Sequence, residues 1–162
     1  MTAEYLQESL VDIMKGLFSG KRYKSPKGGL VPINVYAQNP PRGKVNVLDE
    51  NDDDEEEEFD PFPYIIVRIS DGDNDRDGSV VNMIFIIGIW DDDLNQQGYR
   101  DVIHAIESIR QRIMANPIID GIAYPKGQFH WMVQEDDYYP YSLGACSQQF
   151  VVASINVEDD FI

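Results

Sequence analysis

The chain has 162 residues, 43% of them hydrophobic, and a formal net charge of −16. This length and apolar content suit a single folded domain over residues 1–162 with a buried core. Duplex binding depends on Lys and Arg neutralising phosphates, so direct DNA binding is not expected, although DNA sliding past an acidic wall remains compatible with this charge.

Neither a disulfide nor a membrane segment is expected. Cys146 is the only cysteine, so an internal disulfide is impossible, which fits a reducing cytoplasm. The N-terminus lacks the basic stretch and apolar core of a signal peptide. The longest apolar run, residues 83–90, is far shorter than the roughly 20 residues that cross a bilayer.

Residues 2–18 are predicted to form a helix that covers a sheet, with a partner-binding helix as the alternative. Thr2 is expected to cap its start and Gly20 to end it. One apolar stripe follows the helical spacing: Leu6, Leu10, Ile13, Met14 and Leu17.

A basic segment follows at residues 21–29, where a solvated loop is the simpler interpretation. The alternative is an electrostatic contact with an acidic neighbouring subunit, which steers docking more than it adds affinity. Its four cations are interface candidates: Lys21, Arg22, Lys24 and Lys27.

A strand is predicted over residues 30–38, with Pro32 favouring an edge or the strand start. Residues 39–43 then break it. The run at residues 49–60 is almost entirely acidic, so like charges resist packing and a mobile loop inserted between two strands of one sheet is expected. The alternative places this run at a subunit contact or in a channel.

Residues 62–90 are predicted to form a β-hairpin, because two β-branched runs flank a turn of Asp, Asn and Gly. The second run is apolar on both faces, which favours a central strand covered on both sides. Asp73, Asp75 and Asp77 also match the opening of a calcium loop. The twelfth position of such a loop is Ile84 here and not a bidentate Glu, so a plain turn is favoured and the metal site is a weak candidate.

A second helix is predicted from residue 95 or 98 to residue 116. Its expected apolar face is Tyr99, Val102, Ile103, Ile106, Ile113 and Met114. Strands are predicted at residues 128–134 and 148–155, joined by an aromatic loop over residues 136–141. This loop either packs over the sheet edge or forms a subunit interface, since Tyr is enriched at interfaces. The aromatic interface candidates are Trp131, Tyr138, Tyr139 and Tyr141.

The order of elements is helix, three strands, helix and two strands. Together they predict an α+β fold, with a mostly antiparallel sheet of about five strands and two main helices packed on one face.

The sequence favours a scaffold over an enzyme. His104 and His130 do not form a metal-ligand pair, and the sequence has no G-x-S-x-G, P-loop or G-x-G-x-x-G motif. No catalytic residue and no cofactor are therefore expected. An unrecognised hydrolase and an acidic calcium-dependent binding module are the alternatives from other functional classes.

The pattern of elements resembles phage tail terminator (tail completion) proteins over about residues 6–157. The resemblance rests on the strand sequences at residues 32–36, 64–70 and 81–91, the helix at residues 99–113 and the closing strand at residues 148–157. The acidic run at residues 49–60 is longer than the family pattern requires.

The resemblance implies a structural virion protein that forms a hexameric ring. Such a ring caps the finished tail tube, stops its polymerisation and presents a surface to the neck, while DNA passes through without specific binding. The implied partners are further copies of this chain, the tail tube protein and a neck or head–tail connector protein, with a sheath protein as a further candidate. The implied location is the host cytoplasm during assembly and then the virion. A different neck or head–tail joining adaptor of the same particle is the main alternative.

Overall fold

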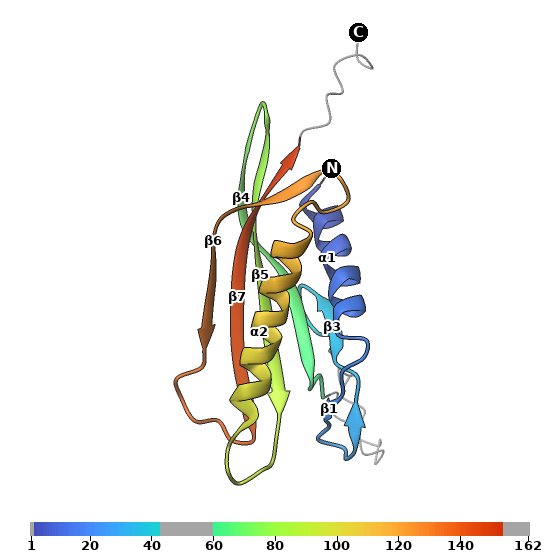
Figure 1. Cartoon of the computed structure of the whole chain (residues 1–162), viewed down its shortest axis with the longest axis vertical. Helices are drawn as coiled ribbons and strands as arrows, with labels where there is room; N and C mark the ends of the chain where they lie inside the picture. Colours follow the sequence, from blue (N-terminus) through green and yellow to red (C-terminus); the bar gives the residue numbers. More distant parts are fainter. Residues whose placement is uncertain (1, 43–59, 154–162) are drawn as a thin grey trace, which may run out of the picture.

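Two helices pack on one face of a five-stranded sheet in the computed structural model, which describes residues 2–42 and 60–153 (Figure 1). The fold is therefore α+β with a mostly antiparallel sheet, as the sequence predicts. The elements in chain order are α1 (Ala3–Leu17), β1 (Tyr23–Lys24), β2 (Leu30–Val31), β3 (Asn34–Ala37), β4 (Tyr64–Asp75), β5 (Gly78–Trp90), α2 (Gly98–Ala115), β6 (Ala123–Val133) and β7 (Tyr141–Ala153).

The strand order in the main sheet is β3-β4-β5-β7-β6. Neighbouring strands are antiparallel except β3 and β4, which are parallel. The sheet is therefore mostly antiparallel, as predicted, with one parallel pair at its edge. A parallel pair needs a connection of about a dozen residues or more, and residues 38–63 between β3 and β4 satisfy that length. Most of the predicted acidic loop falls in this connection and lies outside the described residues.

Helix α1 begins where the sequence predicts it. The Thr2 hydroxyl accepts a hydrogen bond from the Tyr5 backbone N–H at 3.2 Å and caps the first turn. The helix ends at Leu17 with Phe18 as its cap, so the prediction that Gly20 ends it is wrong. The predicted stripe is buried or partly buried against the core: Leu6, Leu10, Ile13, Met14 and Leu17.

A buried glutamine joins α1 to the edge of the sheet. The Gln7 side-chain amide, 6% exposed, donates to the Val67 carbonyl at 2.8 Å and to the Gln38 side-chain oxygen at 2.9 Å. The Gln38 amide also donates to the Ile69 carbonyl and accepts from the Ile69 N–H. These bonds continue the edge of the sheet along β4, just beyond the end of β3.

Replacing Gln7 with methionine should lower the free energy of unfolding by about 0.5–1.5 kcal/mol, the net value of a hydrogen bond. The loss stays small because the Val67 carbonyl also accepts from the Gln38 backbone N–H, and the Gln38 side-chain oxygen also accepts from Ile69. Urea unfolding of the two proteins measures the difference. A loss above about 3 kcal/mol would contradict the view that both acceptors keep a second partner.

The single strand predicted over residues 30–38 is two strands. β2 pairs with β1 in a separate two-stranded sheet, whereas β3 pairs with β4. Pro32 lies between them, and its missing N–H cannot join a ladder. Its neighbour Ile33 is buried in the core.

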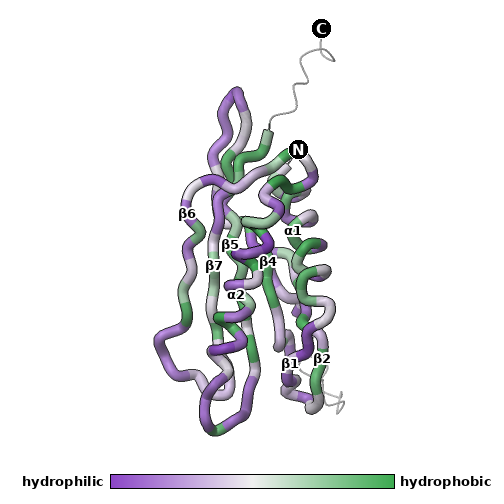
Figure 2. The backbone as a smooth tube through the Cα atoms, in the orientation of Figure 1, coloured by the Kyte–Doolittle hydropathy of each residue, from purple (hydrophilic) through white to green (hydrophobic). Residues whose placement is uncertain are grey.

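The predicted hairpin is confirmed. β4 and β5 pair from Tyr64 opposite Gly88 to Asp75 opposite Gly78. The turn end of the hairpin extends well beyond both helices and is hydrophilic (Figure 1, Figure 2).

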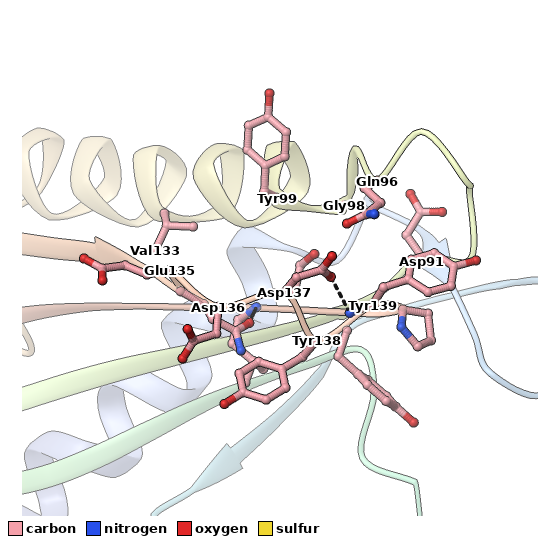
Figure 3. A pocket seen from close by; sticks show the side chains of 15 residues that line it. Asp91, Gln96, Gly98, Tyr99, Val133, Glu135, Asp136, Asp137, Tyr138 and Tyr139 are labelled. Carbon is pink, nitrogen blue, oxygen red and sulfur yellow. Dashed lines mark hydrogen bonds between the residues drawn. The ribbon is translucent and has the colours of Figure 1, made fainter.

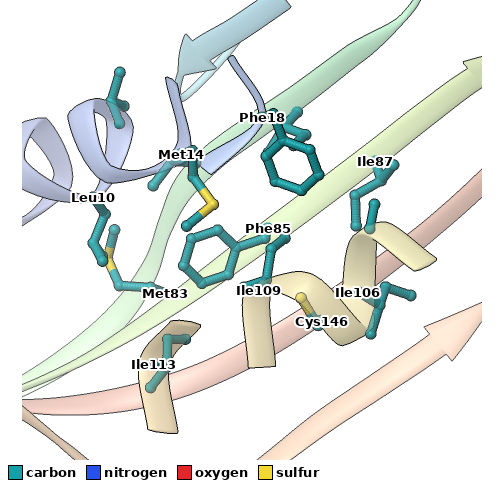
Figure 4. Close-up of a cluster of buried hydrophobic side chains, with 14 of the residues drawn as sticks. Leu10, Met14, Phe18, Met83, Phe85, Ile87, Ile106, Ile109, Ile113 and Cys146 are labelled. Atoms are coloured by element: carbon teal, nitrogen blue, oxygen red, sulfur yellow. The ribbon is translucent and has the colours of Figure 1, made fainter. Parts of the chain in front are cut away.

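The core lies between the sheet and the two helices, around the fully buried Phe85 at the centre of β5 (Figure 4). Gly144 of β7 lies directly beneath α2, and a Cβ there would be 2.4 Å from Val102 Cγ1. The missing side chain thus lets α2 approach the sheet closely. Side chains from both helices and the central strands surround Phe85: Leu10, Met14, Phe18, Met83, Ile87, Ile106, Ile109, Ile113 and Cys146.

Helix α2 keeps its predicted bounds, but its buried face is rotated from the predicted one. Tyr99, Ile103 and Met114 are 40%, 38% and 66% exposed. At 100° per residue these three lie together on one flank, whereas Ala105 and Ile109 lie toward the sheet and are buried. The predicted apolar arc was therefore centred too far toward this flank.

Strands β6 and β7 begin earlier than predicted, at residues 123 and 141, and the predicted end at residues 154–155 lies outside the described residues. Gly127 interrupts the register of β6 without ending the strand. The side chains of β6 alternate between the two faces of the sheet, with three of them toward the helices: Phe129, Trp131 and Val133.

β5 is the central strand, as predicted, but the described residues cover only one of its faces. Phe85 and Ile87 face the helices and are fully buried. Ile84 and Ile86 point to the opposite face and are half-buried. No helix in residues 2–42 and 60–153 packs on that side, because both helices pack against the same face (Figure 1). The prediction of cover on both sides is therefore wrong for the part of the chain described.

Candidate interaction surface along α2 and β6

Trp131 lies at the end of a row of side chains that runs across the sheet, and the other members of this row belong to the buried core. Val67, Phe85, Cys146 and Trp131 are register partners across β4, β5, β7 and β6, and all four point toward the helices. The first three are at most 2% exposed, whereas Trp131 is 54% exposed. A large ring in a core register but open to solvent is typical of a side chain that a partner covers.

Further apolar and aromatic side chains continue from Trp131 along the border of α2 and β6. Tyr99 and Ile103 come from the exposed flank of α2, and Phe129 and Val133 lie two residues to either side of Trp131 on β6. Tyr138 follows in the β6–β7 turn and is 56% exposed. We refer to these six side chains as the α2–β6 stripe: Tyr99, Ile103, Phe129, Trp131, Val133 and Tyr138.

Two hollows lie along this stripe. One, of about 360 Å³, lies between the start of α2 and the β6–β7 turn and is lined by Tyr99, Val133 and Tyr138 (Figure 3). The other, of about 490 Å³, lies near the end of α2 and is lined by Met114 and Phe129. Exposed aromatic rings beside hollows are the surface shape found at protein interfaces, where side chains of one partner fill pockets of the other.

The aromatic turn is held in place by the connector that precedes α2. The Tyr139 hydroxyl donates to the Asp92 carbonyl at 2.5 Å, and the Tyr139 N–H donates to the Asp137 carboxylate at 2.9 Å. The Asp91 N–H donates to the Pro140 carbonyl at 2.9 Å. Tyr138 is therefore presented from an anchored turn, which reduces the entropy that a contact must overcome.

Tyr141 does not lie with the other aromatic interface candidates. Its ring is 4.7 Å from that of Phe62, which is 4.8 Å from the ring of Tyr64, on the face of the sheet away from the helices. A Cβ on Gly88 would come within 2.8 Å of the Phe62 and Tyr64 rings, so this glycine makes room for them. The structure thus divides the predicted aromatic set between two faces.

The predicted basic segment already has partners within its own chain. The Lys24 ammonium is 2.9 Å from an Asp91 oxygen and 3.7 Å from an Asp92 oxygen. Lys21 donates to the Ser108 hydroxyl, and Arg22 donates to the carbonyls of Ser19 and Lys21. Lys27, the fourth cation, is exposed. The predicted contact with a neighbouring subunit stays a prediction. Lys27 could bind an acidic neighbour without breaking the hydrogen bonds and ion pairs of Lys21, Arg22 and Lys24.

Two partly buried carboxylates, Asp91 and Asp101, set the electrostatics of this end of the molecule. Burial alone would raise the pKa of Asp91, but the Asp93 N–H and the Lys24 ammonium outweigh it and hold that pKa below its usual value. Burial, with the Asp91 charge as a second cause, raises the pKa of Asp101. Burial, followed by the Asp101 charge, raises the pKa of Tyr23 to about 12.

Replacing Lys24 with methionine should raise the pKa of Asp91, which carboxyl NMR titration measures. The folded-state pKa of Asp91 lies below its unfolded value, so ionised Asp91 stabilises the fold above pH 3.8, and this stability is lost as pH falls through the folded pKa. The variant should therefore be slightly less stable than the wild type at pH 7 and equally stable at low pH. The difference is small because Lys24 is exposed. An unchanged Asp91 titration would contradict the assigned cause.

The predicted calcium candidates lie at the hairpin end, where Asp73 pairs with Val80 and Asp75 with Gly78 in the β ladder. One Asp75 carboxylate oxygen accepts the N–H groups of Asp77 and Gly78, so its role is to shape the turn. Among the residues that the structure describes, no group of three His, Cys, Asp or Glu side chains could hold a metal ion.

The remaining reactive side chains are dispersed. Cys146 is 2% exposed, and burial raises the pKa of its thiol, which disfavours the reactive thiolate. His104 lies on the exposed side of α2, and His130 lies on β6 on the opposite face of the sheet. Within residues 2–42 and 60–153, no helix is long and apolar enough to cross a membrane.

A scan against models of known protein families and a search of curated proteins both find no match to this sequence. The α2–β6 stripe must therefore be interpreted from its own chemistry. Sequence reasoning proposed Trp131 and Tyr138 as interface candidates but assigned Tyr99 and Ile103 to the buried face. A helical projection centred on Ile109 would have placed both on an exposed flank.

Proposed function

We propose that this chain is a structural virion protein that forms a ring at the end of a phage tail tube, ends tube polymerisation and joins the tube to the neck. The observation that carries the proposal is the α2–β6 stripe, in which Trp131 and Tyr138 are more than half exposed. A few residues supply most of the binding energy at protein interfaces, and Trp and Tyr are enriched among them. The resemblance of the element order to tail terminator proteins supports the choice of a tail.

In this proposal each copy contacts two neighbours, the end of the tail tube and a neck or head–tail connector protein, with a sheath protein as a further contact in contractile tails. A head-to-tail contact between identical subunits generates a ring when its rotation closes. The net charge of −16 suits a ring that DNA traverses without binding, because a wall of like charge prevents sticking. Assembly takes place in the host cytoplasm, and the mature location is the virion.

The test is to polymerise tail tube protein with and without this chain and to measure tube lengths by electron microscopy. Substoichiometric amounts are expected to shorten the tubes and to place a ring at one end of each. A Trp131→Ala variant should cap less well, whereas Leu30→Ala, which removes an exposed side chain on β2 away from the stripe, should cap normally. Unchanged tube length with no ring at the ends would refute the proposal. A ring that binds only a connector protein would indicate the alternative, a neck or head–tail joining adaptor.

A further inference from the structure

The face of the main sheet opposite the helices carries an apolar row across four strands. Register pairs Ile66 of β4 with Ile86 of β5, Ile86 with Ala145 of β7, and Ala145 with Met132 of β6. Ile84 and Leu143 lie on the same face in the adjoining rows. Ile66 is only 4% exposed, so it is already covered within the chain. We refer to the other five side chains as the uncovered sheet face: Ile84, Ile86, Met132, Leu143 and Ala145.

None of the five side chains of the uncovered sheet face is a carboxylate. The nearest acid among the described residues on the same side of the sheet is Asp71, which lies one row beyond Ile84 and accepts a hydrogen bond from the Asn82 amide. The row across the sheet that contains Ile84 also contains Arg68 of β4 and His130 of β6, which lie on the same face. In a chain with 29 acidic and 13 basic residues, a patch without acids is the part of the surface that can approach another acidic molecule with least repulsion. Depletion of charge at the centre is also the compositional mark of an interface.

The α2–β6 stripe has the opposite charge at its margin. Glu107 lies on α2, and the segment after β6 supplies Glu135, Asp136 and Asp137. The Glu107 carboxylate is already bound by Arg110, whereas the segment after β6 borders the hollow that Tyr99 and Tyr138 line. The two apolar surfaces therefore have complementary surroundings, with the Arg68 guanidinium beside one and three carboxylates beside the other.

We infer that the uncovered sheet face of one copy of this chain packs on the α2–β6 stripe of a second copy, in a head-to-tail contact. The two surfaces lie on opposite sides of the sheet, and one contact of this kind covers both. A two-fold contact between two uncovered sheet faces would leave Trp131 exposed and would place Arg68 near its own copy. The inference depends on the proposed function only in that the repeated contact closes into a ring. The same head-to-tail contact repeated without closing would give a fibre.

Met132 and Trp131 allow the two surfaces to be tested separately. They are neighbours on β6 that point to opposite faces and are 59% and 54% exposed. Met132→Glu places a negative charge on the uncovered sheet face, against the acidic margin of the stripe. Trp131→Lys places a positive charge on the stripe, against Arg68. Leu30→Lys, on an exposed apolar side chain outside both surfaces, is the matched control.

The experiment measures mass by sedimentation velocity over a concentration series, in free solution and with tail tube protein present. Each variant alone is expected to need at least about a tenfold higher concentration to assemble, the cost of losing an interface hot spot, while the control assembles like the wild type. A mixture of Met132→Glu and Trp131→Lys keeps one intact pair of surfaces, so it should assemble at a lower concentration than either variant alone. Thermal unfolding checks that all variants fold.

Other outcomes identify a different occupant of the uncovered sheet face and overturn the inference. If Trp131→Lys stays dimeric while Met132→Glu is a monomer, the contact is two-fold. If the wild type is a monomer in both settings and Met132→Glu lowers its melting temperature, another segment of the same chain covers the face. If both variants assemble like the wild type and rings still cap tubes, this contact is wrong although the proposed function stands. If the wild type neither assembles nor changes tube length, both fail.

Discussion

Replacing Phe85 with alanine should lower the free energy of unfolding by about 3–5 kcal/mol, the range for large core aromatics. Phe85 is fully buried at the centre of β5 and lies among side chains from both helices (Figure 4). Truncation leaves a cavity between the sheet and the two helices. Because the surrounding side chains are close-packed, they can fill this cavity only in part. Urea unfolding at low temperature measures the loss, and Phe85→Leu gives a milder second point if the alanine variant is unfolded.

Ile86→Ala is the matched control, because Ile86 is the next residue on the same strand and points to the uncovered sheet face. Ile86 is half-buried, so its truncation in the monomer should cost less than about 2 kcal/mol. Equal losses at both positions would contradict the one-sided core. They would mean that the isolated chain covers both faces of β5.

This pair of residues also shows where sequence reasoning stops. The run that contains Ile84, Phe85, Ile86 and Ile87 is apolar at every position, so a central strand follows from it. The sequence of this run does not predict which of its two faces the helices cover. That depends on the side of the sheet on which the segments that connect α1 and α2 to the strands place the two helices. Local patterns therefore predicted the strand, and only the packing of distant elements distinguished its two faces.

The same limit explains the sheet pairing and the candidate surface. Both helices and the hairpin follow from spacing within short segments, and their positions agree with the structure. The parallel pairing of β3 with β4 depends on residues far apart in sequence, for which spacing carries no signal. Residue type made Trp131 and Tyr138 interface candidates, but their exposed neighbours Tyr99 and Ile103 were missed, because the exposed flank of α2 is defined only once α2 packs on the sheet.

Gly144→Ala should also be strongly destabilising, by about 1–3 kcal/mol, because it overpacks a close contact between layers. The new Cβ would be 2.4 Å from Val102 Cγ1 and 3.1 Å from the Met132 carbonyl oxygen. Val102 is fully buried and β-branched in a helix, so its side chain has essentially one rotamer and cannot move aside. The strain must then be relieved by moving α2 away from β7, which weakens the packing of Ile106 as well.

Gly16→Ala is the control for Gly144→Ala. Gly16 lies in α1, and a Cβ there meets no atom within 4 Å, so the change should stabilise the protein by about 0.5–1 kcal/mol through helix propensity and loss of unfolded-state freedom. The two substitutions are chemically identical and should change stability in opposite directions in the same urea series. Because α2 supplies Tyr99 and Ile103 to the α2–β6 stripe, Gly144→Ala should also weaken assembly. A Gly144→Ala variant as stable as the wild type would contradict the close approach of α2 to the sheet on which the α2–β6 stripe depends.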